Sequence, residues 1–154
     1  MSRLSAVSGD THAVSTVAGC HMVDLPRHVH ANGALTPVQN GPGRILPFDV
    51  RRVFYLYDVP AESSRGGHSH VEAHELIVAV SGSFDVTIDD GRDRRTVTLN
   101  RPFCGLYIMP GIWRSIDNFS GGSVCLVLTS EEYDEADYVR DYDEFLRRTA
   151  VKKL

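Results

Sequence analysis

A chain of 154 residues with 42% hydrophobic and 23% charged residues has the length and composition of one folded domain of ordinary size. Its formal net charge of -4 argues against a broad basic surface for nucleic acid or anionic lipid. The longest apolar runs, 76–80 and 124–128, are too short to cross a bilayer, and the N-terminus lacks a signal-peptide pattern. We therefore expect a cytoplasmic protein without a membrane or nucleic-acid partner.

The cysteines exclude two further classes of protein. Cys20, Cys104 and Cys125 are odd in number and widely spaced, and no CxxC pair occurs. This pattern is untypical of a disulfide framework or a structural zinc site. Cys104 and Cys125 stand in apolar surroundings, where a buried structural thiol is the expected role.

The N-terminal third lacks helical patterns. Residues 1–19 are rich in Ser, Ala, Val and Thr without a clear period, and we expect a flexible arm or a strand exchanged with a partner. Residues 20–48 are interrupted by Gly and Pro, which favours short strands and turns. We expect residues 20–154 to form one domain.

The middle of the chain predicts β-structure throughout. Residues 52–58 are aromatic and β-branched, and residues 83–88 alternate between apolar and polar side chains, as in a strand with one buried face. Asp90-Gly91 predicts a tight hairpin turn after this strand. Further strands are expected at 75–80, 95–99, 105–109, 114–118 and 124–128. About eight short strands joined by Gly and Pro turns favour an all-β jelly roll or a related barrel.

The last 25 residues change character. Residues 130–146 are acidic early and basic late, which predicts a short C-terminal helix that Ser130 could cap. Tyr138, Tyr142 and Phe145 are spaced to share one face of this helix, and we expect that face to pack on the β-structure.

The chemically informative segment is 65–75, which contains His68-Ser69-His70. Because side chains alternate along a strand, both imidazoles point to the same face, which is the interior of a small barrel. Glu75 then begins the next strand, and Gly82 marks the turn after it.

This spacing resembles the first motif of the cupin superfamily, in which two His and a Glu bind a metal together with a His of a second motif. The resemblance implies a cupin, or jelly-roll, β-barrel. In the stretch that resembles the second motif, 110–118, the position of the metal-binding His holds Arg114. A protonated guanidinium has no lone pair for a metal, so the chemistry of the site favours no metal. As an alternative, His68, His70 and Glu75 could form a two-His-one-carboxylate set for Fe(II).

A closer resemblance covers residues 52–145, which are similar to the cupin-fold nucleotide-sugar 3,4-ketoisomerases, a group called WxcM-like. The matching stretches are Arg52-Val-Phe-Tyr-Leu-Tyr-Asp58, Arg65-Gly-Gly-His-Ser-His70, Gly105-Leu-Tyr-Ile-Met-Pro-Gly-Ile-Trp113 and the Tyr-rich acidic tail 133–145. The chain departs from the family at Val71, Glu75 and Arg114. The resemblance implies a homodimer that converts a TDP-4-keto-6-deoxyhexose into its 3-keto isomer without a cofactor.

The resemblance also implies roles for individual residues. His70 would be the principal acid and base, because an imidazole exchanges protons near neutral pH, and His68 would orient it or move the hydroxyl proton. From their positions next to the HxH motif, Tyr55 could relay a proton or simply pack, and Arg65 could stabilise the enediolate or a phosphate. The expected substrate contacts are Arg114, Trp113, Tyr107 and Glu75, with core packing as the alternative role of Trp113 and Tyr107.

Two other classes of function remain open at this point. One is a metal-dependent cupin of the Fe(II) dioxygenase kind, and the other is a non-catalytic cupin that binds a sugar nucleotide. A deoxysugar 3,5-epimerase is a related possibility, but the His–Asp pair of those enzymes is not evident from the sequence.

Overall fold

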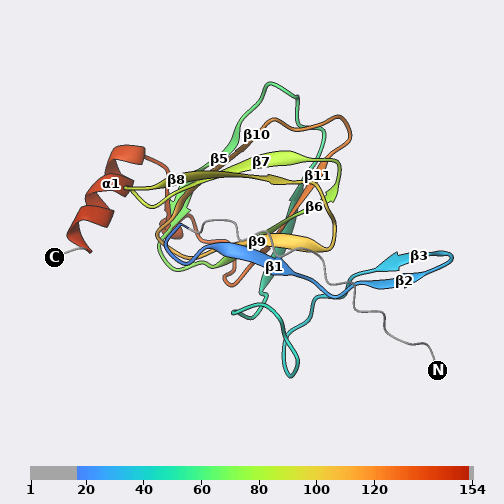
Figure 1. Ribbon diagram of the computed structural model, residues 1–154. Helices are drawn as coiled ribbons and strands as arrows, with labels where there is room; N and C mark the ends of the chain where they lie inside the picture. Colours follow the sequence, from blue (N-terminus) through green and yellow to red (C-terminus); the bar gives the residue numbers. More distant parts are fainter. Residues whose placement is uncertain (1–16, 153–154) are drawn as a thin grey trace.

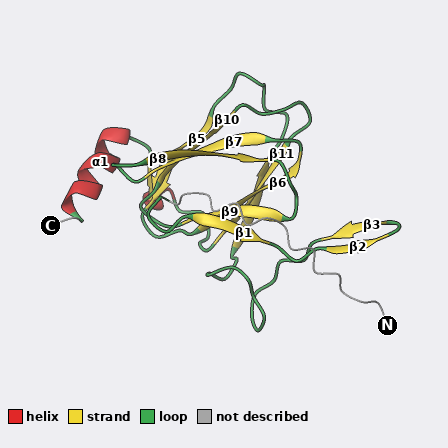
Figure 2. Cartoon of the chain, viewed as in Figure 1, coloured by secondary structure: helices red, strands yellow, loops and turns green. Residues whose placement is uncertain are grey.

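Two five-stranded antiparallel sheets form the body of the protein in a computed structural model that describes residues 17–152 (Figures 1 and 2). The first sheet has the order β1 (His21–Asp24), β9 (Cys104–Ile108), β6 (Glu75–Ser81), β11 (Val124–Thr129) and β4 (Arg52–Leu56). The second has the order β12 (Tyr138–Val139), β5 (Arg65–His70), β10 (Trp113–Asp117), β7 (Phe84–Asp89) and β8 (Arg94–Leu99).

The expected fold class, an all-β jelly roll with a short C-terminal helix, is confirmed. Strands that are distant in the chain pair with each other in both sheets, as in other jelly rolls. One part of the expectation is corrected: no hydrogen-bonded ladder between described strands joins the two sheets into a closed barrel. Strands β4 and β12 are therefore edge strands, each at one end of its sheet.

Alternation along the strands separates an interior face from an exterior face. In β6, Ile77 and Ala79 pack into the core between the sheets, whereas Leu76 and Val78 pack on the outer side of the first sheet. Opposite, Phe84 and other apolar residues of β7, β8 and β10 complete the core from the second sheet. Odd-numbered positions of β6, including Glu75, consequently face the interior.

The segment before β4 covers the outer side of the first sheet. Val23, Leu25, Leu46 and Phe48 contact the apolar side chains on that side. Between them a hairpin of β2 (His28–His30) and β3 (Gly33–Leu35) projects from the body, on the side opposite the C-terminal helix (Figure 1). Most of the predicted N-terminal arm, residues 1–16, lies outside the described residues. Val17 belongs to the buried core.

The C-terminal helix α1 (Tyr142–Val151) begins later than the acidic run suggested. Its N-cap is Asp141, whose carboxylate accepts a hydrogen bond from the backbone N–H of Glu144. Ser130 instead accepts a hydrogen bond from the backbone N–H of His74. The residues between them form a 3-10 turn, η1 (Glu135–Asp137), and strand β12, so Tyr138 is a strand residue and not part of the helix.

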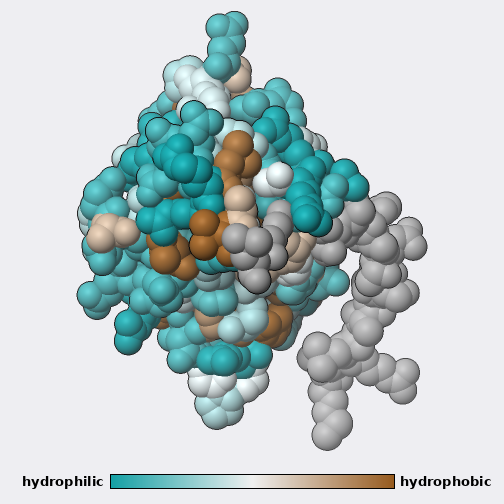
Figure 3. All heavy atoms as spheres, turned by 90° about the vertical axis from the view of Figure 1, so that its left-hand side faces the viewer, coloured by the Kyte–Doolittle hydropathy of each residue, from teal (hydrophilic) through white to brown (hydrophobic). Residues whose placement is uncertain are grey.

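Helix α1 packs on the exterior of the second sheet through Tyr142 and Phe145, whose rings contact the ring of Trp113. The face of the molecule that carries α1 is largely hydrophilic and contains a small apolar area near its middle (Figure 3). No helix among residues 17–152 combines the length and apolar character required to span a membrane.

Candidate active site

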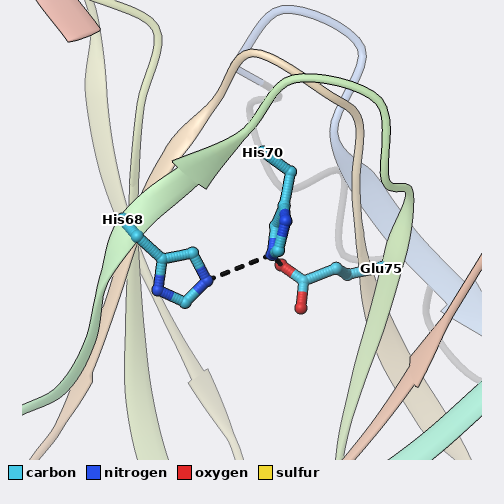
Figure 4. Close-up of side chains that lie close together, drawn as sticks. All are labelled: His68, His70 and Glu75. Carbon is cyan, nitrogen blue, oxygen red and sulfur yellow. Dashed lines mark hydrogen bonds and ion pairs between the residues drawn. The ribbon is translucent and has the colours of Figure 1, made fainter. Parts of the chain in front are cut away.

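The two histidines of β5 lie side by side in the interior, in a close edge-to-face arrangement (Figure 4). His68 and His70 are 5% and 4% exposed, and their Nε2 atoms are 3.1 Å apart. The alternation of β5 directs both rings inward, as predicted from the HxH spacing. A hydrogen bond between the two Nε2 atoms requires that one ring donates and the other accepts.

Asp137 holds the other nitrogen of His70. Its Oδ2 lies 2.9 Å from Nδ1 of His70, and its Oδ1 accepts a hydrogen bond of 2.6 Å from the backbone N–H of Glu72. A further bond of 3.3 Å comes from the backbone N–H of Ala73. Asp137 therefore fixes both the ring of His70 and the turn that connects β5 to β6.

Asp137 was not predicted from the sequence as a site residue. It is one of several acidic residues in the tail, and no local pattern distinguishes it from its neighbours Asp134 and Glu135. The signal that was available is the match of the whole acidic tail to the ketoisomerases, which does not single out one residue. The His–Asp pair that was not evident in the sequence is thus present between His70 and Asp137.

Glu75 and Arg114 form a buried ion pair next to the histidines. Nε and Nη2 of Arg114 donate to the two carboxylate oxygens of Glu75 over 3.0 and 2.8 Å, and the two side chains are almost fully buried. Burial alone raises the pKa of Glu75, but the charge and hydrogen bonds of Arg114 outweigh this effect, and the pKa is lowered to about 2. The carboxylate also lies 3.4 Å from Nε2 of His70.

Gly66 makes room for this ion pair. Its φ of 68° is in the left-handed region, and a Cβ at this position would overlap Nη1 of Arg114. The same Nη1 donates to the carbonyl oxygen of Gly66 over 3.3 Å. The position of the guanidinium thus requires a glycine at position 66.

The environment of His68 keeps its ring neutral. Burial, and then the positive charge of Arg114, lower the pKa of His68 to about 3. Its Nδ1 is buried and has no hydrogen-bond partner among the described residues. In contrast, both ring nitrogens of His70 have partners, Asp137 and His68.

Tyr138 lies against both histidines from the neighbouring strand β12. Its ring centroid is 4.9 Å from that of His68 and 4.5 Å from that of His70, which is its register partner. Its hydroxyl accepts a hydrogen bond of 3.2 Å from Nη2 of Arg52. Neither Tyr138 nor Arg52 was predicted from the sequence as a site residue.

The donor set does not fit a divalent metal. Ligand atoms of His68, His70 and Glu75 lie within 4.8 Å of one another, close enough for a shared ion. However, Arg114 donates to both oxygens of Glu75 and brings a positive charge to the place where a cation would bind. The carboxylate of Glu75 is therefore not available as a metal ligand.

Four of the predicted site residues do not contact the two histidines of β5. Tyr55, Tyr107 and Trp113 face the exterior, and Arg65 is exposed at the start of β5. Tyr55 lies on the outer side of β4 and is 59% exposed, between the inward-facing Phe54 and Leu56. Tyr55 is therefore not placed to act with the histidines, whereas the role expected of Arg65 stays a prediction.

The two aromatic residues expected to bind substrate are also exterior. Trp113 packs under α1, and Tyr107 lies on the outer side of the first sheet, where its hydroxyl is 2.6 Å from Nδ1 of His74. Both are packing residues in the structure. Of the predicted substrate contacts, Arg114 and Glu75 alone share the interior with the histidines.

The jelly-roll fold and the paired interior histidines define a cupin-type site with a His–Asp pair. Residues 18–150 match the model of the family described as FdtA: WxcM-like, C-terminal. The chain belongs to this family.

Relatives of known activity agree with this assignment. The chain is 34% identical over 133 residues to a TDP-4-oxo-6-deoxy-alpha-D-glucose-3,4-oxoisomerase of Aneurinibacillus thermoaerophilus, which covers 86% of this chain and 94% of the relative. It is 32% identical to a 3,4-ketoisomerase of Thermoanaerobacterium thermosaccharolyticum, which was solved as a histidine-to-asparagine mutant in complex with TDP-4-keto-6-deoxyglucose. The two structures match with a TM-score of 0.85 over 90% of this chain and 99% of that chain. A TDP-quinovose 3,4-ketoisomerase of Campylobacter jejuni is 38% identical, with a TM-score of 0.80 over 85% and 99% of the two chains.

The substitution Glu75→Gln tests the energetics of the ion pair. It leaves the buried charge of Arg114 without a carboxylate, so we expect the free energy of unfolding at pH 7 to fall by about 3–5 kcal/mol. Urea denaturation measures this change. The control Glu135→Gln removes the surface partner of Arg140. The side chain of Glu135 is 58% exposed, so we expect this variant to change the free energy of unfolding by less than about 1 kcal/mol.

The pH dependence of the stability of wild type and Glu75→Gln gives a second test of the ion pair. Because the folded pKa of Glu75 lies at about 2, below its ordinary value of 4.5, the stabilisation by the carboxylate is complete above pH 4.5 and is lost as the pH falls toward 2. The stability difference between wild type and Glu75→Gln should thus be constant from pH 7 to 5 and shrink below 4.5. A difference that stays constant down to pH 3 would contradict the ion pair.

Proposed function

We propose that this protein is an isomerase that converts a TDP-4-keto-6-deoxyhexose into its 3-keto isomer, with residues 20–154 folded as one catalytic domain. The observation that carries the proposal is the buried pair His68–His70, supported by Asp137, inside a member of a family whose characterised relatives are TDP-sugar 3,4-ketoisomerases. The two rings supply what the reaction needs, a group that removes a proton from carbon and returns it.

We assign the protonation of both rings from the hydrogen bonds of His70 with Asp137 and His68. Asp137 accepts from Nδ1–H of His70, which leaves a lone pair on its Nε2. That lone pair accepts from Nε2–H of His68, so the free lone pair of His68 is on Nδ1. This is the nitrogen without a partner. We therefore propose that His68 is the base and that His70 acts through it, the reverse of the roles expected from the sequence.

The reaction then proceeds through an enediol. Nδ1 of His68 takes the proton from C3, and the electrons of that bond form the C3–C4 double bond while the C4 carbonyl oxygen becomes negatively charged. As Nδ1 of His68 gains the C3 proton, its Nε2 proton passes to Nε2 of His70, so His68 stays neutral, in keeping with its low pKa. The positive charge then lies on His70, beside the carboxylates of Asp137 and Glu75. Return of a proton to C4, with transfer of the O3 proton to O4, yields the 3-ketone and a C4 hydroxyl.

The metal-dependent and the non-catalytic readings of the sequence are less consistent with the site. A dioxygenase needs a metal, and the ion pair of Glu75 with Arg114 occupies its expected ligand position. A binding protein without catalysis does not need a His–His–Asp chain that ends in an unpartnered nitrogen.

An isotope experiment tests the proposed reaction. Metal-stripped protein is incubated with TDP-4-keto-6-deoxyglucose in deuterated water and followed by NMR. We expect a 3-keto product with deuterium at C4, and unchanged turnover in the presence of a strong chelator. A lack of product under these conditions, or turnover that requires an added divalent metal, would contradict the proposed mechanism.

The substitution Asp137→Asn tests the hydrogen-bond chain. The amide no longer fixes Nδ1–H of His70 as a carboxylate does, so kcat should fall by about 10²-fold or more, in keeping with the loss of a tautomer-fixing aspartate. 15N NMR of the imidazoles should show Nδ1–H for His70 in the wild type and a mixture in the variant.

The matched control is Asp134→Asn. It makes the same change of charge three residues away, at a cap position where Asn is equally suited to accept from Ala136 N–H. We expect its kcat and imidazole signals to equal those of the wild type. Equal kcat values in the two variants would show that Asp137 has only a structural role.

We further propose that the protein works as a cytoplasmic homodimer. The projecting hairpin exposes Val29 and Leu35, which are 62% and 59% exposed, and the outer side of β4 exposes Val53, Tyr55 and the following Tyr57. Apolar side chains exposed on a projecting element and along an edge strand are typical of a surface covered by a partner. A second copy of the chain, with the same hairpin, is the occupant that we propose.

Light scattering coupled to gel filtration tests the dimer. We expect a mass of about twice that of one chain at micromolar concentration, and a monomer for the double variant Val29→Asp/Leu35→Asp, because carboxylates would be buried without partners. The control Val151→Asp adds a charge at an exposed site on α1 and should remain dimeric. A monomeric wild type would contradict this proposal.

A further inference from the structure

Two buried polar atoms lack a partner, and both belong to residues that contact Tyr138. Among residues 17–152, the buried side-chain nitrogens and oxygens without a hydrogen bond are Nε of Arg52 and Nδ1 of His68. Arg52 reaches the hydroxyl of Tyr138 through Nη2, and the ring of His68 lies 4.9 Å from the ring of Tyr138. Unpaired buried polar atoms are unfavourable, and a pair of them beside one ring indicates a place for a polar ligand.

Arg52 lies where the two sheets come together without a hydrogen-bonded ladder. It is on edge strand β4, on the same face as Phe54 and Leu56, which pack against the core. Tyr138 is on edge strand β12 of the other sheet. The hydrogen bond between them spans this opening, so the guanidinium is at the edge of the interior that contains the histidines.

Arg52 is the cation of this region that no carboxylate neutralises. Arg114 is paired with Glu75, and Arg140, above the ring of Tyr138, is paired with Glu135. None of the ion pairs among residues 17–152 includes Arg52.

The surroundings of its guanidinium are aromatic. The central carbon of the guanidinium lies 5.3 Å from the ring centroid of Phe54 and 5.5 Å from that of Tyr133. A half-buried cation held by aromatic rings keeps its charge available to an anion.

We propose that Arg52 binds the sugar oxygen that becomes negatively charged when the C3 proton is removed. This inference rests on the proposed function and assigns a catalytic contact to a residue outside the histidine motif. The unpaired Nε–H of Arg52 is a donor that matches the carbonyl oxygen of an α-hydroxyketone. The unpaired Nδ1 of His68 is an acceptor that matches the neighbouring carbon, which gives up a proton. Negative charge that develops on that oxygen strengthens the contact with Arg52 in the transition state.

A phosphate of TDP could use the same guanidinium chemistry, and the two anions predict different measurements. A contact with the enediolate acts in the transition state, so its loss lowers kcat and leaves TDP affinity unchanged. A contact with phosphate acts equally in the ground state, so its loss weakens TDP binding and leaves kcat at saturation unchanged. The contact of Arg52 with Tyr138, which touches both histidines, favours the sugar oxygen.

The experiment compares Arg52→Gln and Arg52→Lys with the control Arg51→Gln. Arg51 is the preceding residue and is exposed, with a distant surface contact to Glu131. We expect kcat of Arg52→Gln to fall by about 10²-fold, as for removal of one oxyanion donor, and Arg52→Lys to retain an intermediate rate. The Kd of TDP, measured by calorimetry, should stay within about twofold of wild type in all three variants.

Chemical rescue keeps the test decisive if Arg52→Gln is poorly folded. Added guanidinium ion should restore part of the activity of Arg52→Ala and none of that of His68→Asn, because only the first leaves a cavity of the right shape and charge. An unchanged kcat in Arg52→Gln, or weaker TDP binding with normal kcat, would overturn the inference. If the wild type itself does not isomerise the sugar, the proposed function fails as well, whereas an active wild type with active Arg52 variants refutes this inference alone.

Discussion

The buried ion pair between Glu75 and Arg114 is the interaction around which the interior is organised. Glu75 comes from β6 of the first sheet and Arg114 from β10 of the second, so the pair links the two sheets across the core. Two charges removed from water are tolerable only as a bidentate pair. Gly66 is accordingly free of a side chain, and the charge of Arg114 helps to keep His68 neutral.

The ion pair also decides what kind of chemistry the cupin scaffold can support. In a metal-binding cupin the carboxylate would be a ligand, but here both of its oxygens are bound by a guanidinium. The two histidines are then left to interact with each other and with Asp137, which produces a hydrogen-bonded chain instead of a coordination sphere. Proton transfer is the chemistry that such a chain supports.

Strand alternation explains both the successes and the errors of the sequence-based site. His68, His70, Glu75 and Arg114 all occupy inward positions of their strands, and the two His were assigned inward from the HxH spacing alone. Tyr55, Trp113 and Tyr107 are each one position away from an inward residue, and they face outward as a result. A one-residue difference reverses the direction of a side chain, so a motif that identifies the correct strand does not identify the correct face.

The sequence by itself determined the features that depend on neighbouring residues: the strands between residues 52 and 128, the turn at Asp90-Gly91, and the shared direction of the two histidines. These follow from backbone geometry and the period of two along a strand. Only the tertiary structure decided which residues meet them, since Asp137 is 67 positions from His70 and Tyr138 is 86 positions from Arg52. Contacts at such separations depend on the path of the whole chain, here the return of the tail to the edge of the second sheet as η1 and β12, and no local pattern encodes that path.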